Sequence, residues 1–306
     1  FTPNTESAML RSLVGSEMCI RDSNNTALVE RLLRDHHINI LVHFAAESHV
    51  DRSITDPDAF IKTNIIGTHS LLKAAKTVWL DEPRANNQPK GNHHFHHVST
   101  DEVYGTLSPT DSAFSETTPY APNSPYAASK AASDHLVRAY HHTYGLNVTI
   151  SNCSNNYGPY QFPEKLIPLT ITNILANRPV TIYGDGQQIR DWLHVEDHAR
   201  GIDRVIHFGE VGEYYNIGGQ NEWVNINLVK LICQLLNEAF KKQPSLAHQY
   251  PEATQARSNN SEKLIQFVTD RLGHECRYSI DATKSMHELG FKAEINFEIG
   301  LLKTIN

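Results

Sequence analysis

Long apolar runs are missing from this 306-residue chain, and none approaches the roughly 18 residues that a membrane-spanning helix requires. An excess of positive charge is missing too, because the net charge of −7 gives no electrostatic basis for binding nucleic acid or an anionic membrane. The four cysteines form no Cys-x-x-Cys pair, so we interpret them as isolated thiols of a cytoplasmic protein. What remains is the composition of an ordinary globular protein, with 40% hydrophobic and 20% charged residues.

The first residues also lack a recognisable pattern. Residues 1–23 show no hydrophobic period, and they have neither the positively charged start nor the long apolar core of a signal peptide. We therefore predict that residues 1–23 are a leader that is not part of the native fold.

From residue 24 onward, short apolar runs alternate with helical periodicity. Helices are expected at 25–36, 57–79, 126–144, 165–176, 195–208 and 227–240, strands at 38–45, 95–99, 147–153, 180–183 and 214–217, and polar loops at 81–92, 109–125 and 241–262. This alternation predicts an α/β fold in which helices cover both faces of a parallel sheet. The rhythm changes after Gly158, which indicates a smaller second domain that is partly interleaved with the first.

A hydroxyl and two acids, Thr100, Asp101 and Glu102, close one of the expected strands. Tyr126 and Lys130 follow at a spacing of four, which puts them on one face of a helix. An ammonium beside a phenol favours the phenolate, so we expect Lys130 to lower the pKa of Tyr126 from about 10. Such a tyrosine can take a proton from a substrate hydroxyl, and the two acids add a second acid/base pair. The alternative is a solvated strand end beside a surface lysine.

Longer blocks of sequence carry a resemblance to one family. The blocks are FAAESHVDRS at 44–53, TN at 63–64, VSTDEVYG at 98–105, SNNYGPYQFPEKLIP at 154–168 and GDGQQIRDW at 184–192. In this order they closely resemble the dTDP-glucose 4,6-dehydratases, within the extended branch of the short-chain dehydrogenase/reductase superfamily. The resemblance implies a Rossmann-like sheet, NAD as cofactor, a homodimer, and dTDP-glucose as substrate in deoxysugar (rhamnose-type) biosynthesis.

The family's chemistry accounts for these residue types. The resemblance implies that C4 of the glucose is oxidised with Tyr126 as the base, aided by Thr100 and Lys130. It further implies that Glu102 removes the C5 proton, that Asp101 protonates the departing C6 hydroxyl, and that the hydride returns to C6. Neighbouring acids with opposite tasks need different protonation states. The alternatives are a related epimerase or decarboxylase, which share the tyrosine and lysine but lack the two acids, or an inactive fragment.

The resemblance also assigns binding residues. Those implied to contact NAD are Phe44, Ala45, Ala46, Glu47, Ser48, Thr63, Tyr126, Lys130 and Asn156. Those implied to contact the sugar nucleotide are Ser48, Thr100, Asn155, Lys165, Leu166, Thr181, Ile182, Tyr183, Arg190, Asn225, Asp270 and His274. Arg190 suits a diphosphate because a guanidinium offers a fork of donors, although an ion pair with Asp191 or Asp197 is the alternative. Leu272 stands where the family usually has proline, which puts the local loop geometry in doubt.

Histidines cluster at His93, His94, His96 and His97. On a strand, neighbouring side chains point to opposite faces, and no nearby cysteine or acid completes a recognisable ligand set. The sequence therefore predicts no metal site here.

A glycine-rich turn is the last absence. In the family, a Gly-x-x-Gly-x-x-Gly turn and an acidic residue that holds the adenosine ribose precede the block at 44–53, yet Gly15 is the only glycine before Gly67. Residues 1–23 would stand in place of roughly two βα units. We therefore expect an incomplete NAD-binding domain at 24–160 and a sugar-nucleotide domain at 161–306. Weak NAD binding, an exposed apolar sheet edge and aggregation on expression should follow.

Overall fold

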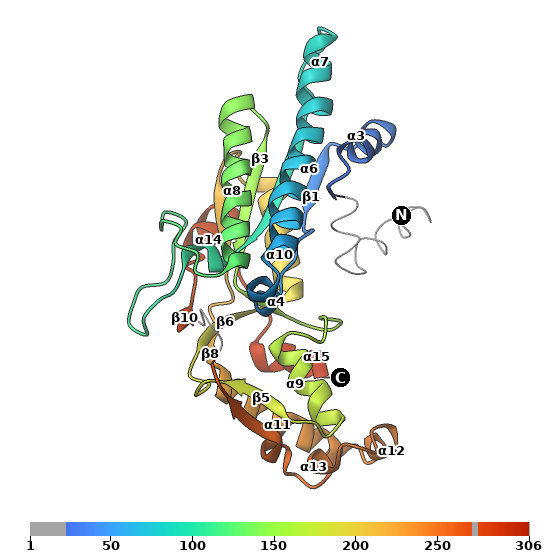
Figure 1. Cartoon of the computed structure of the whole chain (residues 1–306), viewed down its shortest axis with the longest axis vertical. Coiled ribbons are helices and arrows are strands. Elements are labelled where there is room, and N and C mark those ends of the chain that lie inside the picture. Colours follow the sequence, from blue (N-terminus) through green and yellow to red (C-terminus); the bar gives the residue numbers. More distant parts are fainter. Residues whose placement is uncertain (1–22, 271–274, 306) are drawn as a thin grey trace.

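A parallel sheet forms the core of the upper lobe in the computed structural model, which describes residues 23–270 and 275–305 (Figure 1). Its strands are β1 (Ile40–His43), β2 (His94–Thr100), β3 (Val148–Cys153) and β7 (Tyr214–Ile217), in the order β1-β2-β3-β7. All three pairings are parallel, so the predicted α/β fold is confirmed. The leader predicted at 1–23 lies outside the described residues except for Ser23.

Helices pack on the two faces of this sheet because side chains alternate along β2. His97 faces α8 (Pro125–Tyr144), where it meets Asp134. Its neighbour His96 faces α10 (Val195–Phe208), where it is close to His198. Helix α3 (Thr26–Asp35) joins the α8 side, and α14 (Thr283–Leu289) packs against β7 and α10.

Local signals explain where α8 begins and ends. The Ser124 side chain accepts a hydrogen bond from the Ala127 N–H at 3.1 Å, and Pro125 occupies the first turn. Gly145 ends the helix in the left-handed conformation. The helix expected at 126–144 is therefore confirmed within one residue.

A long helical run lies beside α8 and exceeds its predicted length. It joins α5 (Pro57–Phe60), η1 (Ile61–Ile66), α6 (Gly67–Lys76), η2 (Thr77–Asp81) and α7 (Glu82–Ala85), of which η1 and η2 are π-helical. The predicted loop at 81–92 is thus wrong for residues 81–85. Glu82 accepts two hydrogen bonds from the Arg34 guanidinium, which ties this last turn to α3.

The lower lobe has smaller sheets. Strands β10 (Arg277–Tyr278), β6 (Ile189–His194) and β4 (Asn155–Tyr157) form one in that order, with β8 (Glu222–Val224) antiparallel to β6. Strands β5 (Val180–Tyr183) and β9 (Ile265–Val268) form a parallel pair. Helices α9 (Leu166–Leu175), α11 (Asn225–Lys242) and α15 (Phe297–Ile305) complete this lobe. Ile167, Ile174, Leu228 and Ile232 are fully buried in its core.

The loop predicted at 241–262 contains further short helices. They are α12 (Leu246–Gln249), α13 (Thr254–Arg257) and the first part of η4 (Ser261–Leu264). The apolar side chains of Ala253 and Ala256 are buried in the lower core, which explains why this polar stretch is ordered against α11. Predicting a loop here was wrong because two small residues give little periodicity.

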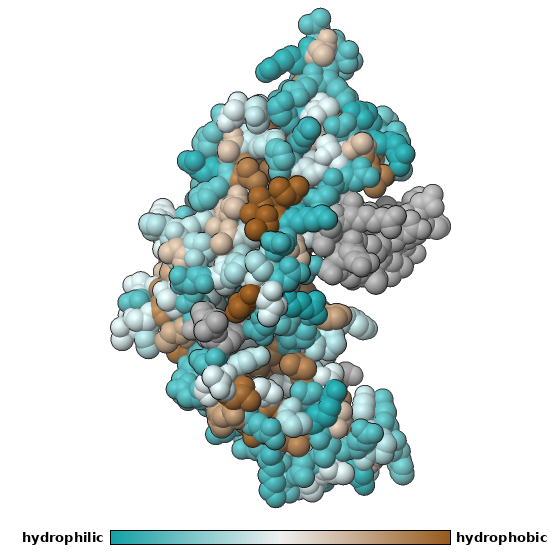
Figure 2. All heavy atoms as spheres, viewed as in Figure 1, coloured by the Kyte–Doolittle hydropathy of each residue, from teal (hydrophilic) through white to brown (hydrophobic). Residues whose placement is uncertain are grey.

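The chain crosses between the lobes more than once. Strand β7 follows the first part of the lower lobe in sequence but pairs with β3 in the upper sheet. The exact domain boundaries at 160 and 161 stay a prediction. None of the helices in the described ranges is long and apolar enough to cross a bilayer, and Figure 2 shows a mostly hydrophilic face with small hydrophobic areas.

Candidate active site

The end of strand β2 turns directly into the acid pair. Thr100 is the last residue of β2, and η3 (Asp101–Tyr104) follows it. The Thr100 Oγ1 accepts a hydrogen bond from the Glu102 N–H at 3.3 Å and donates one to Asp101 Oδ1 at 3.3 Å. This hydroxyl caps the turn, so the local sequence itself fixes how the two acids leave the sheet.

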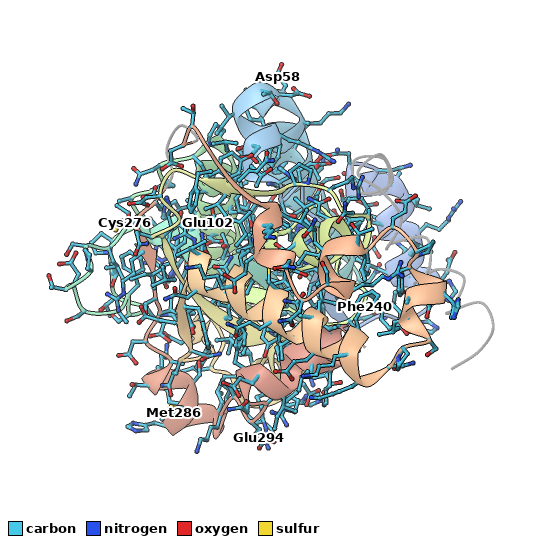
Figure 3. All side chains as sticks on the ribbon, turned by 90° about the horizontal axis from the view of Figure 1, so that it is seen from below. Asp58, Glu102, Phe240, Cys276, Met286 and Glu294 are labelled. Atoms are coloured by element: carbon cyan, nitrogen blue, oxygen red, sulfur yellow. The ribbon has the colours of Figure 1, made fainter. Side chains whose placement is uncertain are left out.

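Asp101 is buried, and its Oδ2 atom has no hydrogen-bond partner in the described structure. Burial raises the pKa of Asp101 well above its usual range, and the charges of Glu102 and Asp191 raise it further. The Arg190 charge opposes this shift. Asp101 therefore suits the role of a neutral acid that donates a proton. Figure 3 labels its neighbour Glu102, whereas Asp58 and Glu294 lie at the outline of the molecule.

Tyr126 lies in the first turn of α8, where its side chain forms a hydrogen bond with Thr100. Burial raises the pKa of Tyr126 well above 10, with a further rise from the Glu102 charge, while a hydrogen bond with Thr100 opposes it. The expectation that Lys130 lowers this pKa is wrong. The Lys130 Nζ instead donates a hydrogen bond to the Val98 carbonyl at 2.7 Å.

Arg190 reaches the same region from β6. Its guanidinium lies 4.4 Å from the centre of the Tyr278 ring, and it donates hydrogen bonds to the carbonyls of Ile189 at 2.8 Å and Glu275 at 3.0 Å. Burial raises the pKa values of both Asp101 and Tyr278, and the charge of Arg190 opposes this rise. The stacked guanidinium is thus close enough to the acid pair to act on it electrostatically.

The carboxylates considered as alternative partners of Arg190 are held by other groups. Asp191 accepts hydrogen bonds from the N–H groups of Gly219 at 2.9 Å and Asn221 at 2.6 Å. Asp197 pairs with Arg200. These contacts remove the reason for assigning Arg190 a purely structural ion pair with either acid.

The residues predicted to contact NAD come from the segment after β1, from η1 and α8, and, for Asn156, from β4. Phe44 is 59% exposed, which leaves its surface open to a ligand. The buried Thr63 Oγ1 and the Asn156 Oδ1 have no hydrogen-bond partner in the described structure. Polar atoms of this kind are expected to find partners, so they fit a site that a cofactor would complete.

Asn64 belongs to the block at 63–64 but was not predicted as a site residue. Its Oδ1 accepts from the Glu47 N–H at 2.9 Å, and its Nδ2 donates to the Glu47 carbonyl at 3.0 Å and to Ser129 Oγ at 2.8 Å. It therefore ties the segment after β1 to α8. An asparagine inside a predicted helix was the available signal, because such a residue needs partners when it is buried.

The predicted sugar-nucleotide residues meet the segment after β1 from the other lobe. The Lys165 Nζ donates to the Ser48 carbonyl at 2.5 Å, and the Tyr183 hydroxyl donates to Asp51 Oδ2 at 3.4 Å. Asp270 Oδ2 accepts from Gln188 Nε2 at 3.3 Å. The first two contacts bring residues that are more than a hundred positions apart to one place.

Other members of that set differ in what they offer. The Oδ1 atoms of Asn155 and Asn225 are buried and have no hydrogen-bond partner in the described ranges. Ile182 is buried in the lower core, which leaves only its backbone for contact, whereas its neighbour Thr181 on β5 is exposed and Leu166 begins α9. His274 and Leu272 lie outside the described residues.

The histidine cluster has structural partners. His94 and His96 each form a hydrogen bond with Thr149 Oγ1, at 2.7 and 2.8 Å, and His96 also meets Ser151 Oγ at 3.0 Å. Within residues 23–270 and 275–305, no group of three or more potential ligands is arranged to hold a metal ion.

A cavity of about 240 Å³ between β6 and residues 293–297 is lined by none of the predicted site residues. We therefore place the chemistry at the acid pair.

Comparison with known proteins decides the family. Residues 11–304 match the family model described as GDP-mannose 4,6 dehydratase. A dTDP-glucose 4,6-dehydratase of Neisseria meningitidis serogroup B is 52% identical over 284 residues, which cover 93% of this chain and 76% of that protein. This chain belongs to the 4,6-dehydratase family. The family assignment confirms the resemblance carried by the sequence blocks.

Two further members of the family support the same assignment. A dTDP-glucose 4,6-dehydratase of Xanthomonas campestris pv. campestris is 53% identical over 285 residues, covering 93% of this chain and 76% of its own length. The structure of DesIV, a dTDP-glucose 4,6-dehydratase from Streptomyces venezuelae with NAD and TYD bound, is 42% identical with a TM-score of 0.79. It matches over 93% of this chain and 76% of that one.

Proposed function

We propose that this chain is a hydro-lyase that converts dTDP-glucose to dTDP-4-dehydro-6-deoxyglucose with NAD as cofactor. The observation that carries the proposal is the placement of a buried, proton-retaining Asp101 next to Glu102 and Tyr126 at the end of β2. An epimerase needs the tyrosine but has no use for this acid. The proposed product is an intermediate of deoxysugar biosynthesis.

The chain's own groups divide the proton transfers between them. Tyr126 takes the proton of the C4 hydroxyl and shares it with Thr100, to which it is hydrogen-bonded. Glu102 removes the proton from C5, which the C4 ketone has made acidic. Asp101 gives its proton to the departing C6 hydroxyl, as its raised pKa allows. When bound, NAD supplies the hydride acceptor and a positive charge that would favour the Tyr126 phenolate.

The binding groups are proposed from their positions. Thr63 and Asn156 would contact NAD with their unpartnered oxygen atoms, and Phe44 would offer an apolar surface. Arg190 would contact the diphosphate of the sugar nucleotide. The predicted weakness of NAD binding stays a prediction, to be checked by calorimetry before any assay, and tight binding would contradict it.

The test uses dTDP-glucose that carries deuterium at C4, with added NAD. The expected product carries that deuterium at C6 and has taken up solvent hydrogen at C5. Asp101→Asn should slow loss of water about 10²–10⁴-fold while the C4 position is still oxidised. Glu298→Gln, on the exposed surface of α15, is the matched control and should leave the rate unchanged. Free NADH accumulating with turnover, or inversion at C4 without loss of water, would overturn the proposal.

We also propose that the protein is a cytoplasmic homodimer. The apolar side chains of Ile61 and Ile66 are 48% and 50% exposed on the helical run beside α8, where a second copy could cover them. Light scattering after size exclusion should give twice the chain mass of 34.5 kDa. A monomer that stays soluble at high concentration would contradict the dimer.

A further inference from the structure

Lys130 places a positive charge in the protein interior. Its side chain is 5% exposed, and burial lowers its pKa from the ordinary value. Its Nζ donates to the Val98 carbonyl at 2.7 Å and lies 3.4 Å from His97 Nε2. Neither partner is charged. Val98 contributes a backbone carbonyl, and the His97 ring is neutral because burial lowers its pKa well below the usual range. A buried ammonium stays protonated only if a negative charge compensates its lost hydration.

The groups near Lys130 show which of them supplies the compensating negative charge. Asp134 and Cys153 are the two groups whose negative forms favour its protonation. Burial raises the pKa of the Cys153 thiol to about 12, so the thiol is neutral at pH 7. His43 is buried on the other side of His97, and burial lowers its pKa too. Asp134 has a pKa of about 6, so it is the one of these groups that is negative at neutral pH.

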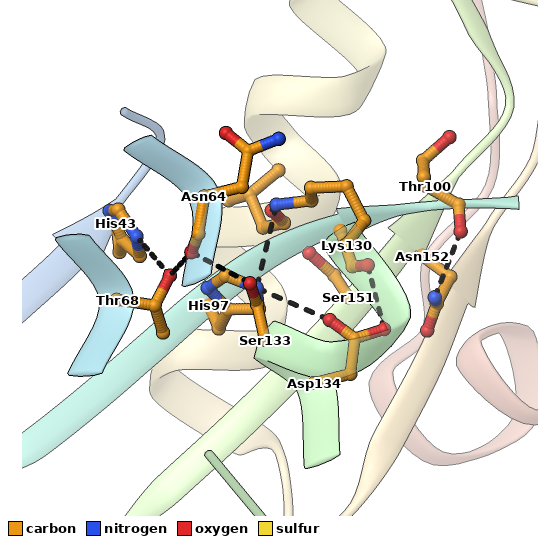
Figure 4. A network of polar contacts seen from close by, with 12 residues as sticks. His43, Asn64, Thr68, His97, Thr100, Lys130, Ser133, Asp134, Ser151 and Asn152 are labelled. Atoms are coloured by element: carbon orange, nitrogen blue, oxygen red, sulfur yellow. Dashed lines mark hydrogen bonds and ion pairs between the residues drawn. The ribbon is translucent and has the colours of Figure 1, made fainter. Parts of the chain in front are cut away.

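Asp134 is held rigidly one helical turn along α8 from Lys130. Its Oδ2 accepts hydrogen bonds from Ser99 Oγ at 2.8 Å and from the Tyr120 hydroxyl at 3.0 Å. Its Oδ1 lies 3.2 Å from His97 Nε2. Figure 4 shows His97, Lys130 and Asp134 as neighbours in one network of polar contacts. The carboxylate is thus fixed by groups of β2 and of the loop before α8.

His97 stands between the two charges. Its Nε2 is close to both Lys130 Nζ and Asp134 Oδ1, and a neutral ring has one proton to place. Asp134 Oδ1 has no hydrogen-bond partner in the described structure, so the ring and the carboxylate are in close contact without a hydrogen bond, and Lys130 keeps its hydrogen bond to Val98. A polarisable, neutral ring in this position transmits the effect of the carboxylate without taking up the charge itself.

We propose that Asp134, linked through His97, is a positioning residue whose fixed negative charge keeps Lys130 protonated and in place behind Tyr126. Asp134 does not touch the substrate site. It acts through Lys130. Its effect on turnover rests on the proposed function, whereas its effect on the protonation of Lys130 does not. The role differs from a structural one because it depends on the charge of Asp134 and not on its hydrogen bonds alone.

The test measures the ammonium group of Lys130 directly. Lysine side-chain ¹⁵N NMR gives its pKa, with the signal assigned by its loss in Lys130→Met. Asp134→Asn keeps the size and the acceptor but removes the charge. We expect the pKa of Lys130 to fall by about one unit or more in this variant. His96→Gln, on the opposite face of β2, is the control and should leave that pKa unchanged. An unchanged Lys130 pKa in folded Asp134→Asn would overturn the proposal.

Two milder variants keep the test decisive if Asp134→Asn does not fold. Ser99→Ala and Tyr120→Phe each remove one donor from Asp134 Oδ2 and leave its charge. Each should change the pKa of Lys130 by less than a unit, and a full loss of the ammonium signal in either would contradict the charge-based role. If turnover is found, the alkaline limb of the kcat profile should move to lower pH in Asp134→Asn with little change in KM. If no turnover is found, the NMR result still decides this proposal separately from the proposed function.

Discussion

Gly105 controls the geometry of the acid pair, and replacing it with alanine gives a sharp test. This residue ends the turn η3 with φ +98° and ψ −142°, a region that only glycine occupies readily. A Cβ added there would lie 2.6 Å from the carbonyl oxygen of Ala121. That carbonyl belongs to backbone, so it cannot swing away as a side chain would. The substitution therefore strains the turn that carries Asp101 and Glu102.

The magnitude follows from two contributions. The backbone conformation costs about 1–3 kcal/mol for a residue with a Cβ. The contact with Ala121 adds an overpacking cost of about 1–3 kcal/mol, so Gly105→Ala should destabilise the fold by roughly 2–6 kcal/mol in all. Two other glycines provide a matched series. Gly145 has φ +74° in open space and should lose about 1 kcal/mol, whereas Gly91, with open space and no positive φ, should change stability by less than about 1 kcal/mol.

Urea denaturation of the three variants, followed by tryptophan fluorescence and circular dichroism, measures the series. The expected order of midpoints is Gly91→Ala highest, then Gly145→Ala, then Gly105→Ala. The last should also lose most activity, because a displaced turn moves both acids. A Gly105→Ala variant as stable as Gly145→Ala would refute the reasoning, since it would show that the contact with the Ala121 carbonyl relaxes at no cost.

Three further predictions concern the core, the buried acid and the arginine. Leu228→Ala removes a fully buried side chain from the lower core and should cost about 2–5 kcal/mol in a denaturation experiment; a loss below 1 kcal/mol would contradict the packing described. The pKa of Asp134 is about 6 when folded, against about 3.9 when unfolded, so its contribution to stability is present below about pH 4 and lost as pH rises through 6. Wild type should therefore lose up to about 3 kcal/mol relative to Asp134→Asn between pH 4 and 7, and parallel stability curves would disprove this. Arg190→Lys keeps the charge but loses the planar stack on Tyr278, so KM for the sugar nucleotide should rise about tenfold or more, while equal kinetics would show that charge alone suffices.

Much of the fold followed from local patterns. Helix α10 and strands β5 and β7 lie at the predicted residues, because each has a clear apolar period bounded by turn residues. Strands β4, β6 and β8 were not predicted. Each is short or mixes polar and apolar residues, and each is ordered by partners that lie far away in the sequence.

The site was predicted in part. The identity of Thr100, Asp101 and Glu102 and their place at a strand end were readable, because the turn is capped by its own threonine. The pKa of Tyr126 was predicted with the wrong sign. Helical spacing shows that Lys130 shares a face with Tyr126, but it does not show that burial and the charge of Glu102 raise the pKa of the phenol.

The sequence by itself determined the residue types that can do the chemistry, the α/β alternation and the membership of the family, because these depend on local order along the chain. The tertiary structure decided which charges meet. It buried Asp101 so that it retains a proton, set Arg190 against Tyr278, and fixed Asp134 behind Lys130 through His97. Protonation depends on burial and on charges brought together from distant segments, and neither can be read from spacing alone.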